Sequence, residues 1–220
     1  GPSLNLSIAD TSGSIGYVKM GRIAKRPEKH ARTVAFGPED SNAGTYLPFS
    51  ENPRLIDPPS GRIVTANQRI AGDDYPHYLS GLWTLPDRAW RIHEMLNEHA
   101  VHDAGTFRAM QQDALSTVAR RLVPLLLEAE PTGDDEAALL RVLKAWDYRF
   151  TLDSRAPAIF MAWLERLNRR VIEDELGSFS FRGAGWTHAN YLSVAQALAG
   201  DKMAWCDDRT TAANEDCARI

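Results

Sequence analysis

Apolar and polar positions alternate at the beginning of the chain, as they do in a half-buried β-strand. In LNLSIAD, Leu4, Leu6 and Ile8 fall on one face of an extended segment, and TSGS follows as a turn. SIGYVKMG alternates again, so the two segments predict a β-hairpin. A stretch rich in proline and glycine continues to Ser60, after which residues 63–70 predict a further strand.

From residue 83 onward, the apolar positions recur every three to four residues, which is typical of amphipathic helices. The first helix is predicted to begin at Thr84 as its N-cap, and a second to occupy 106–125. A third is predicted over 135–146, and a longer one after the caps Asp153 and Ser154. The fold class expected is α+β, with a β-rich segment over residues 1–80 and a mainly helical segment over 81–220.

The two ends of the chain suggest a piece of a longer protein. Gly1 and Pro2 resemble the residue of a removed affinity tag. The last predicted helix begins after Asp208 and reaches residue 220 without a glycine, a proline or a basic turn to end it. We therefore expect this last helix to continue beyond the sequence.

The composition is that of a globular protein. A formal net charge of -4 offers no basic surface for a nucleic-acid backbone, so nucleic acid is not expected as a partner. No stretch approaches the roughly 18 apolar residues of a membrane helix, so no membrane partner is expected either. Cys206 and Cys217 are compatible with one local disulfide in an exported protein or with two thiols in a cytosolic one.

Several common catalytic and cofactor motifs are missing. The sequence has no Walker loop, and GAGWTH lacks the third glycine of a dinucleotide fingerprint. His93 begins a zinc-protease motif, but Asn97 stands where the second histidine is required, and His99 and His102 lack a clear third ligand. GSFSF fails as a nucleophile elbow because Phe181 replaces its final glycine. No metal site is therefore assigned.

Six phrases along the chain nevertheless have the order of one known family. They are NLSIADTSGSIGYVKMGRI, LPFSENP, SGRIVTANQRI with DDYP, LWTLPDRAWRI, QQDALS and AWDYRFTLDSRAPAIFMAW. Together they resemble the penicillin amidase family of N-terminal-nucleophile hydrolases, from Leu4 to Trp163 and more loosely to Cys217. The resemblance implies part of an αββα architecture. It also implies a precursor cut into two chains, the larger of which opens with a catalytic serine that is both nucleophile and, through its α-amine, base.

The resemblance also implies roles for two residues of this chain. Asn67, by its place in TANQR, matches the asparagine whose side-chain NH2 holds the oxyanion, and Arg88 matches an arginine that orients this asparagine or the substrate. From the residues alone, the favoured interpretation of Asn67 is a turn-forming or backbone-bonding residue at a strand end. Arg88 is equally a partner of Asp87 or of the carboxylates of Asp73 and Asp74.

Departures from the family pattern limit what the resemblance implies. Ser3 is followed by LNL and not by the pattern expected after the processed serine, so the nucleophile is expected outside this chain. Leu79 stands where the family places a calcium-binding aspartate, so no cofactor and no ligand are assigned here, although the full-length protein could hold a calcium ion. The expected partners are a small acylated substrate and the remaining parts of the precursor. The expected compartment is the periplasm or the exterior of the cell.

Two other functions fit the sequence. One is a self-standing binding or structural domain with no chemistry of its own. The other is a different hydrolase in which Ser178 or Ser180 works with His188 across the loop FSFRGAGW.

Overall fold

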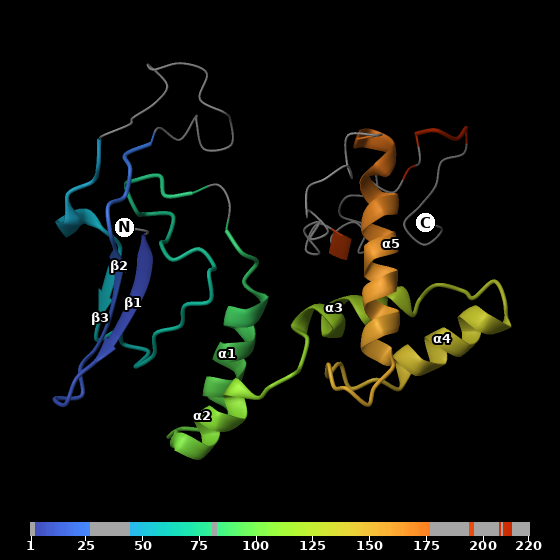
Figure 1. The fold of residues 1–220 in the computed structure, drawn as a ribbon, viewed down its shortest axis with the longest axis horizontal. Helices are drawn as coiled ribbons and strands as arrows, with labels where there is room; N and C mark the ends of the chain where they lie inside the picture. The colour runs from blue at the N-terminus through green and yellow to red at the C-terminus, as the bar shows by residue number, and fades with distance from the viewer. Residues whose placement is uncertain are drawn as a thin grey trace. The chain divides into compact units, whose positions relative to one another are not determined.

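The computed structural model describes residues 3–26, 45–80, 83–176, 194–195, 207 and 209–212. Within these residues the chain forms a small antiparallel sheet followed by helices, which confirms the α+β fold class (Figure 1). Contacts divide the chain into two compact units, Gly1–Ala100 and Val101–Ile220. The predicted change from β-rich to helical sequence at residue 80 therefore falls inside the first unit.

The sheet of the first unit contains β1 (Leu4–Ala9), β2 (Ile15–Met20) and β3 (Arg54–Ile56), in the order β1-β2-β3. The predicted hairpin is confirmed, because β1 and β2 pair antiparallel from Leu4 with Met20 to Ala9 with Ile15. Asp10 shapes the turn between them: its carboxylate accepts hydrogen bonds from the backbone N–H groups of Ser12 at 2.8 Å and Ser14 at 3.1 Å. The Ser12 hydroxyl also donates to this carboxylate, and this bond, followed by those of the backbone, lowers the pKa of Asp10.

The two faces of this sheet differ in exposure. One face keeps a row of apolar side chains exposed, from 38% to 66%: Leu4, Leu6, Ile8, Met20 and Ile56. On the other face, Tyr17 is 5% exposed. The interior of the unit therefore lies on the Tyr17 side of the sheet.

A short 3₁₀ helix, η3 (Phe49–Glu51), precedes β3 and is attached to the end of β2 by Asn52. The Asn52 side chain is buried, and its Nδ2 donates to the carbonyl oxygens of Lys19 at 2.7 Å and Gly21 at 3.0 Å. These bonds satisfy backbone groups at the point where β2 ends.

The strand predicted over 63–70 is wrong, since this segment is irregular and β3 lies earlier, at Arg54–Ile56. Side chains take the backbone groups that a strand would use: Gln68 binds Val64 O and Ala66 N–H, and Arg88 binds Ala66 O. Asn67 also has a φ of 66°, which interrupts any extended conformation.

The helices are α1 (Asp87–Asn97) in the first unit, and α2 (Ala104–Gln111), α3 (Thr117–Leu126), α4 (Asp134–Lys144) and α5 (Ala156–Leu176) in the second. Thr84 was predicted as the N-cap of the first helix, but this position belongs to Pro86, so the helix begins two residues later than expected. The predicted helices over 135–146 and after residue 154 are confirmed by α4 and α5. None of the described helices is long and apolar enough to cross a membrane.

The single helix predicted over 106–125 is wrong, because α2 and α3 are separated by a short extended segment. Backbone N–H groups of Ser116 and Phe150 donate to Tyr148 O and Ala114 O, both at 2.9 Å. The Ser116 hydroxyl then accepts from Ala119 N–H at 3.1 Å and caps α3. Pairing with a segment more than thirty residues away therefore outweighs the local helical pattern.

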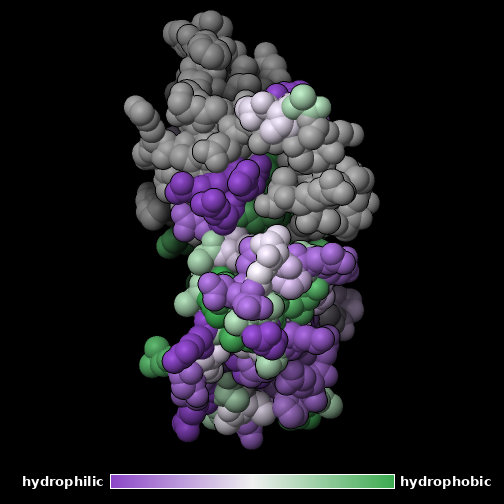
Figure 2. Space-filling model, turned by 90° about the vertical axis from the view of Figure 1, so that its right-hand side faces the viewer, coloured by the Kyte–Doolittle hydropathy of each residue, from purple (hydrophilic) through white to green (hydrophobic). Residues whose placement is uncertain are grey.

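The core of the second unit joins α3, α4 and α5. Leu122 and Val123 are 0% exposed, and Leu143 and Phe160 are 1% exposed. Trp146, 7% exposed, packs with its ring centroid 5.7 Å from that of Phe160, and its Nε1 donates to Arg149 O at 2.9 Å. On the face drawn in Figure 2, hydrophobic surface is broken up by hydrophilic side chains.

Two leucines of α4 give a matched test of this core. Leu143 is 1% exposed and Leu139 is 47% exposed, so the same truncation creates a cavity only at the first. Leu143→Ala is expected to lower the free energy of unfolding by about 2–5 kcal/mol, and Leu139→Ala by less than about 1 kcal/mol. Urea denaturation of both variants checks this, and equal losses would contradict the packing described.

Candidate active site

The turn that carries Asn67 connects the sheet of the first unit to the segment before α1. Asn67 has φ 66°, in the left-handed region that asparagine tolerates better than most residues. Its carbonyl oxygen accepts from Thr84 N–H at 3.2 Å, and the preceding residue, Ala66, is 7% exposed. Asn67 itself is exposed, so an exposed carboxamide directly follows a buried residue.

Arg88, in the first turn of α1, holds this carboxamide in one orientation. Its Nη2 donates to Ala66 O at 2.7 Å and to Asn67 Oδ1 at 2.8 Å. A guanidinium group only donates, so the oxygen of the carboxamide must face Arg88 and the NH2 group must face away. Among the described residues, no hydrogen-bond partner of Asn67 Nδ2 is present, which leaves two N–H donors for a ligand.

The local pairing considered for Arg88 is not the arrangement found. Asp73 pairs with Arg69, with 2.6 Å between Nη1 and Oδ1, whereas the hydrogen bonds of Arg88 go to Ala66 and Asn67. The structure thus brings together the two residues that the sequence motifs singled out. The positive charge also polarises the carboxamide and strengthens its NH2 as a donor.

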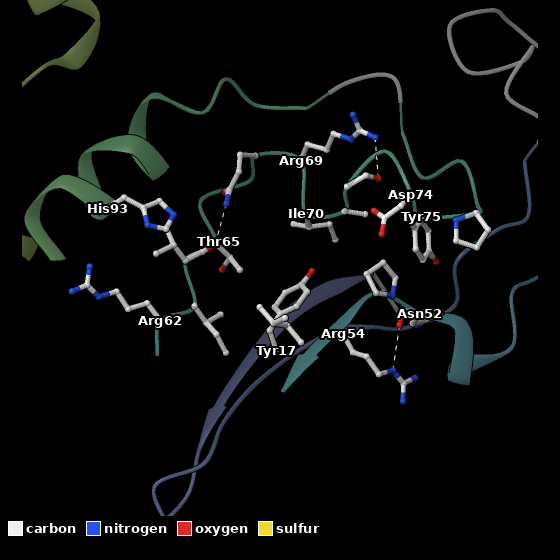
Figure 3. Close-up of a pocket in the computed structure, with 18 of the residues that line it drawn as sticks. Tyr17, Asn52, Arg54, Arg62, Thr65, Arg69, Ile70, Asp74, Tyr75 and His93 are labelled. Atoms are coloured by element: carbon white, nitrogen blue, oxygen red, sulfur yellow. Dashed lines mark hydrogen bonds between the residues drawn. The ribbon is translucent and has the colours of Figure 1, made fainter. Parts of the chain in front are cut away.

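A pocket of about 690 Å³ lies within the first unit between the sheet and residues 62–76. Figure 3 shows Tyr17 rising from the sheet into this space, with Thr65 and Ile70 across from it, while Arg54 and Arg62 extend away from its centre. Thr65 and Gln68 line the pocket, whereas Asn67 and Arg88 do not. The turn therefore separates this pocket from the carboxamide of Asn67.

The pocket contains two buried polar side chains. The hydroxyl of Tyr17 donates to Asn5 Oδ1 at 3.0 Å, and burial raises the pKa of Tyr17 to about 12. Asn52 Oδ1 is buried without a hydrogen-bond partner among the described residues. Three arginines of the described residues line the pocket, and each is already bound: Arg54 to Phe49 O, Arg62 to Asn97 Oδ1, and Arg69 to Gly72 O and Asp73 Oδ1.

Other residues considered from the sequence form no second site in the described part of the chain. His93 lines the rim of the pocket, and no group of three or more His, Cys, Asp or Glu residues there could hold a metal ion. Leu79 is half-buried and its side chain offers no oxygen ligand. Five other candidate residues named in the sequence predictions lie outside the described ranges: Ser178, Ser180, His188, Cys206 and Cys217.

Comparison with known proteins places the chain in a family. The family model for penicillin amidase matches residues 1–220. The chain belongs to the penicillin amidase family. It is 33% identical over 172 residues to penicillin acylase 2 proenzyme of Pseudomonas sp. (strain SE83), covering 76% of this chain and 22% of that protein.

Other relatives agree with this assignment. The chain is 31% identical over 181 residues to the acyl-homoserine lactone acylase QuiP of Pseudomonas putida, covering 73% of this chain and 22% of that protein. A penicillin G acylase structure from Alcaligenes faecalis has a TM-score of 0.60 at 23% identity over 80% of this chain and 34% of that one, which shows a shared fold. The chain thus spans 22% of the length of each of the two relatives compared by sequence.

Gln68 has a part in this site that the sequence patterns do not indicate. Its side chain fastens the turn before Asn67, within a segment whose pattern predicts a strand. The sequence held a weak signal against a strand here. The pair Asn67-Gln68 is uncommon in a strand interior, and its two carboxamides can bind backbone groups.

Tyr17 provides a spectroscopic test of the pocket. Its phenol is expected to ionise at about pH 12 in the native state and near 10.0 in the unfolded chain. Because the unfolded chain releases this proton first, the free energy of unfolding should fall as the pH rises between these values. Ultraviolet titration should show a late tyrosinate step that is absent from Tyr17→Phe; superimposable curves would contradict the burial.

Proposed function

We propose that this chain is part of a larger N-terminal-nucleophile amide hydrolase, in which Asn67 supplies the side-chain half of the oxyanion hole and Arg88 orients it. The observation that carries the proposal is the pair of hydrogen bonds from Arg88 Nη2 to Ala66 O and Asn67 Oδ1, which directs the NH2 of Asn67 away from Arg88. Membership of the penicillin amidase family supports the reaction class.

The proposed reaction begins with a serine at the start of the larger chain of the mature enzyme, outside the sequence described here. Its hydroxyl oxygen forms a bond to the substrate carbonyl carbon, and its own α-amine takes the hydroxyl proton. The carbonyl oxygen becomes an anion and accepts a hydrogen bond from Asn67 Nδ2. Collapse of this intermediate breaks the C–N bond, the amine leaves with the proton, and water then hydrolyses the acyl-enzyme.

A fixed neutral donor suits this step. The carboxamide carries no charge that would need solvation in the ground state, and its donor gains most when the carbonyl oxygen becomes negative. Arg88 prevents the carboxamide from rotating by half a turn, which would replace the NH2 by a carbonyl oxygen facing the anion. The strained backbone at Asn67 is consistent with such a role, since strain is concentrated at functional sites.

The substrate proposed is a small N-acylated molecule, either a β-lactam antibiotic with an amide side chain or an N-acyl homoserine lactone. Relatives named for each substrate class support this range: a penicillin acylase and an acyl-homoserine lactone acylase. The remaining parts of the precursor would complete the site, and the periplasm or the exterior of the cell is the proposed compartment.

Asn67→Ala tests the oxyanion donor. In the full-length enzyme it is expected to lower kcat about 100-fold to 1000-fold with little change in KM, because the lost hydrogen bond forms mainly in the transition state. Hydrolysis of a chromogenic acyl amide measures this. Asn97→Ala, an exposed asparagine of the same unit, serves as the control; equal activities of the two variants would rule out the proposed role of Asn67.

Arg88→Met tests the orienting role separately. Loss of a charged donor from Asn67 Oδ1 is expected to lower kcat about 10-fold to 100-fold while KM changes little. Arg69→Met is the matched control, because Arg69 is exposed and pairs with the exposed Asp73. A rise in KM at constant kcat would instead assign Arg88 to substrate binding.

A further inference from the structure

The backbone around Asn67 belongs to no helix or strand, so its polar groups need other partners. Gln68 provides two of them. Its Oε1 accepts from Ala66 N–H at 2.6 Å, and its Nε2 donates to Val64 O at 2.9 Å. One side chain thus bridges two backbone groups of the residues that lead into Asn67.

We propose that Gln68 is a positioning residue for the oxyanion donor: its carboxamide fixes the turn from which Asn67 projects. This inference rests on the proposed function of Asn67 and adds a residue to which neither the motifs nor the comparisons assign a role. Gln68 does not touch the reacting atoms; it acts through the backbone of Ala66 and Asn67.

Both backbone polar groups of Ala66 are bound by side chains. Gln68 binds its N–H, while Arg88 binds its C=O at 2.7 Å. These two groups belong to the peptide units on either side of the Ala66 Cα atom, so both units are held by side chains. The unit that connects Ala66 to Asn67 sets the φ of Asn67, and therefore the direction of its Cα–Cβ bond.

The conformation of Asn67 explains why such support is needed. A non-glycine residue with φ 66° is held in an uncommon conformation only when its surroundings determine it. Arg88 donates to Ala66 O, and the backbone N–H of Thr84 donates to Asn67 O. Without Gln68, the segment before Asn67 would lose two of its side-chain bonds, keep only that of Arg88 to Ala66 O, and could relax toward the extended conformation that its sequence favours.

The chemistry of the bridge requires a carboxamide. Ala66 N–H needs an acceptor and Val64 O needs a donor, and the two ends of Gln68 meet these needs in a single orientation. Glutamate at this position would keep the acceptor but place a carboxylate oxygen against Val64 O. Methionine would keep the approximate shape and lose both bonds. These two variants separate hydrogen bonding from the filling of space beside the pocket.

A double-mutant cycle in the full-length enzyme tests the proposal. Gln68→Met is expected to lower kcat for a chromogenic acyl amide about 10-fold with KM unchanged, because the donor is displaced from its place in the transition state. In the Asn67→Ala background the same substitution should cause less than about a twofold further loss, because the group that it positions is gone. Gln111→Met, at an exposed position of α2, is the matched control.

The possible outcomes separate the two proposals. If Asn67→Ala lowers kcat but Gln68→Met does not, Gln68 has no positioning role and the oxyanion donor stands. If the two losses multiply in the double variant, Gln68 acts independently of Asn67 and the inference is overturned. If Gln68→Met does not fold, the same cycle is measured with Gln68→Glu. If neither variant folds, the Gln68 side chain is needed for the stability of the whole unit, and the proposed positioning role is overturned.

Discussion

The hydrogen bonds from Arg88 to Ala66 O and Asn67 Oδ1 are the interaction on which the account of the site depends. They connect the first turn of α1 to an irregular segment and decide which end of a carboxamide faces outward. Because a guanidinium group cannot accept a hydrogen bond, its chemistry alone requires this orientation of the carboxamide. A flexible asparagine in a turn thereby becomes a donor with a defined direction, the property that transition-state stabilisation requires.

The surroundings of this turn show how irregular backbone is supported without a strand. Side chains replace a strand partner: Gln68 and Arg88 bind the groups around Ala66, and Asn52 similarly binds the end of β2. These bonds leave Asn67 exposed and in a left-handed conformation next to the buried Ala66. The pocket behind the turn holds Tyr17 and Asn52, whose Oδ1 has no hydrogen-bond partner among the described residues, and it is lined by neither Asn67 nor Arg88.

Local patterns predicted the elements whose partners are close in sequence. The hairpin followed from alternation and a short turn, and α4 and α5 followed from their apolar repeats. Prediction failed where distant groups decide the structure. In the segment 63–70, Ala66 O is bound by Arg88, about twenty residues later in the chain. Between α2 and α3, the helical pattern is interrupted because Ser116 N–H donates to Tyr148 O. Asn67 and Arg88 were found through the family motifs, whereas their mutual contact and the part played by Gln68 required the fold.

A crystal structure of the full-length enzyme with a boronic acid bound to its nucleophile would test the central claim most directly, because the adduct places an oxygen where the oxyanion forms. The account predicts Asn67 Nδ2 at about 2.7–3.1 Å from that oxygen, with Oδ1 still accepting from Arg88. An Asn67 side chain turned away from the adduct, or a carboxamide whose oxygen faces it, would contradict the account.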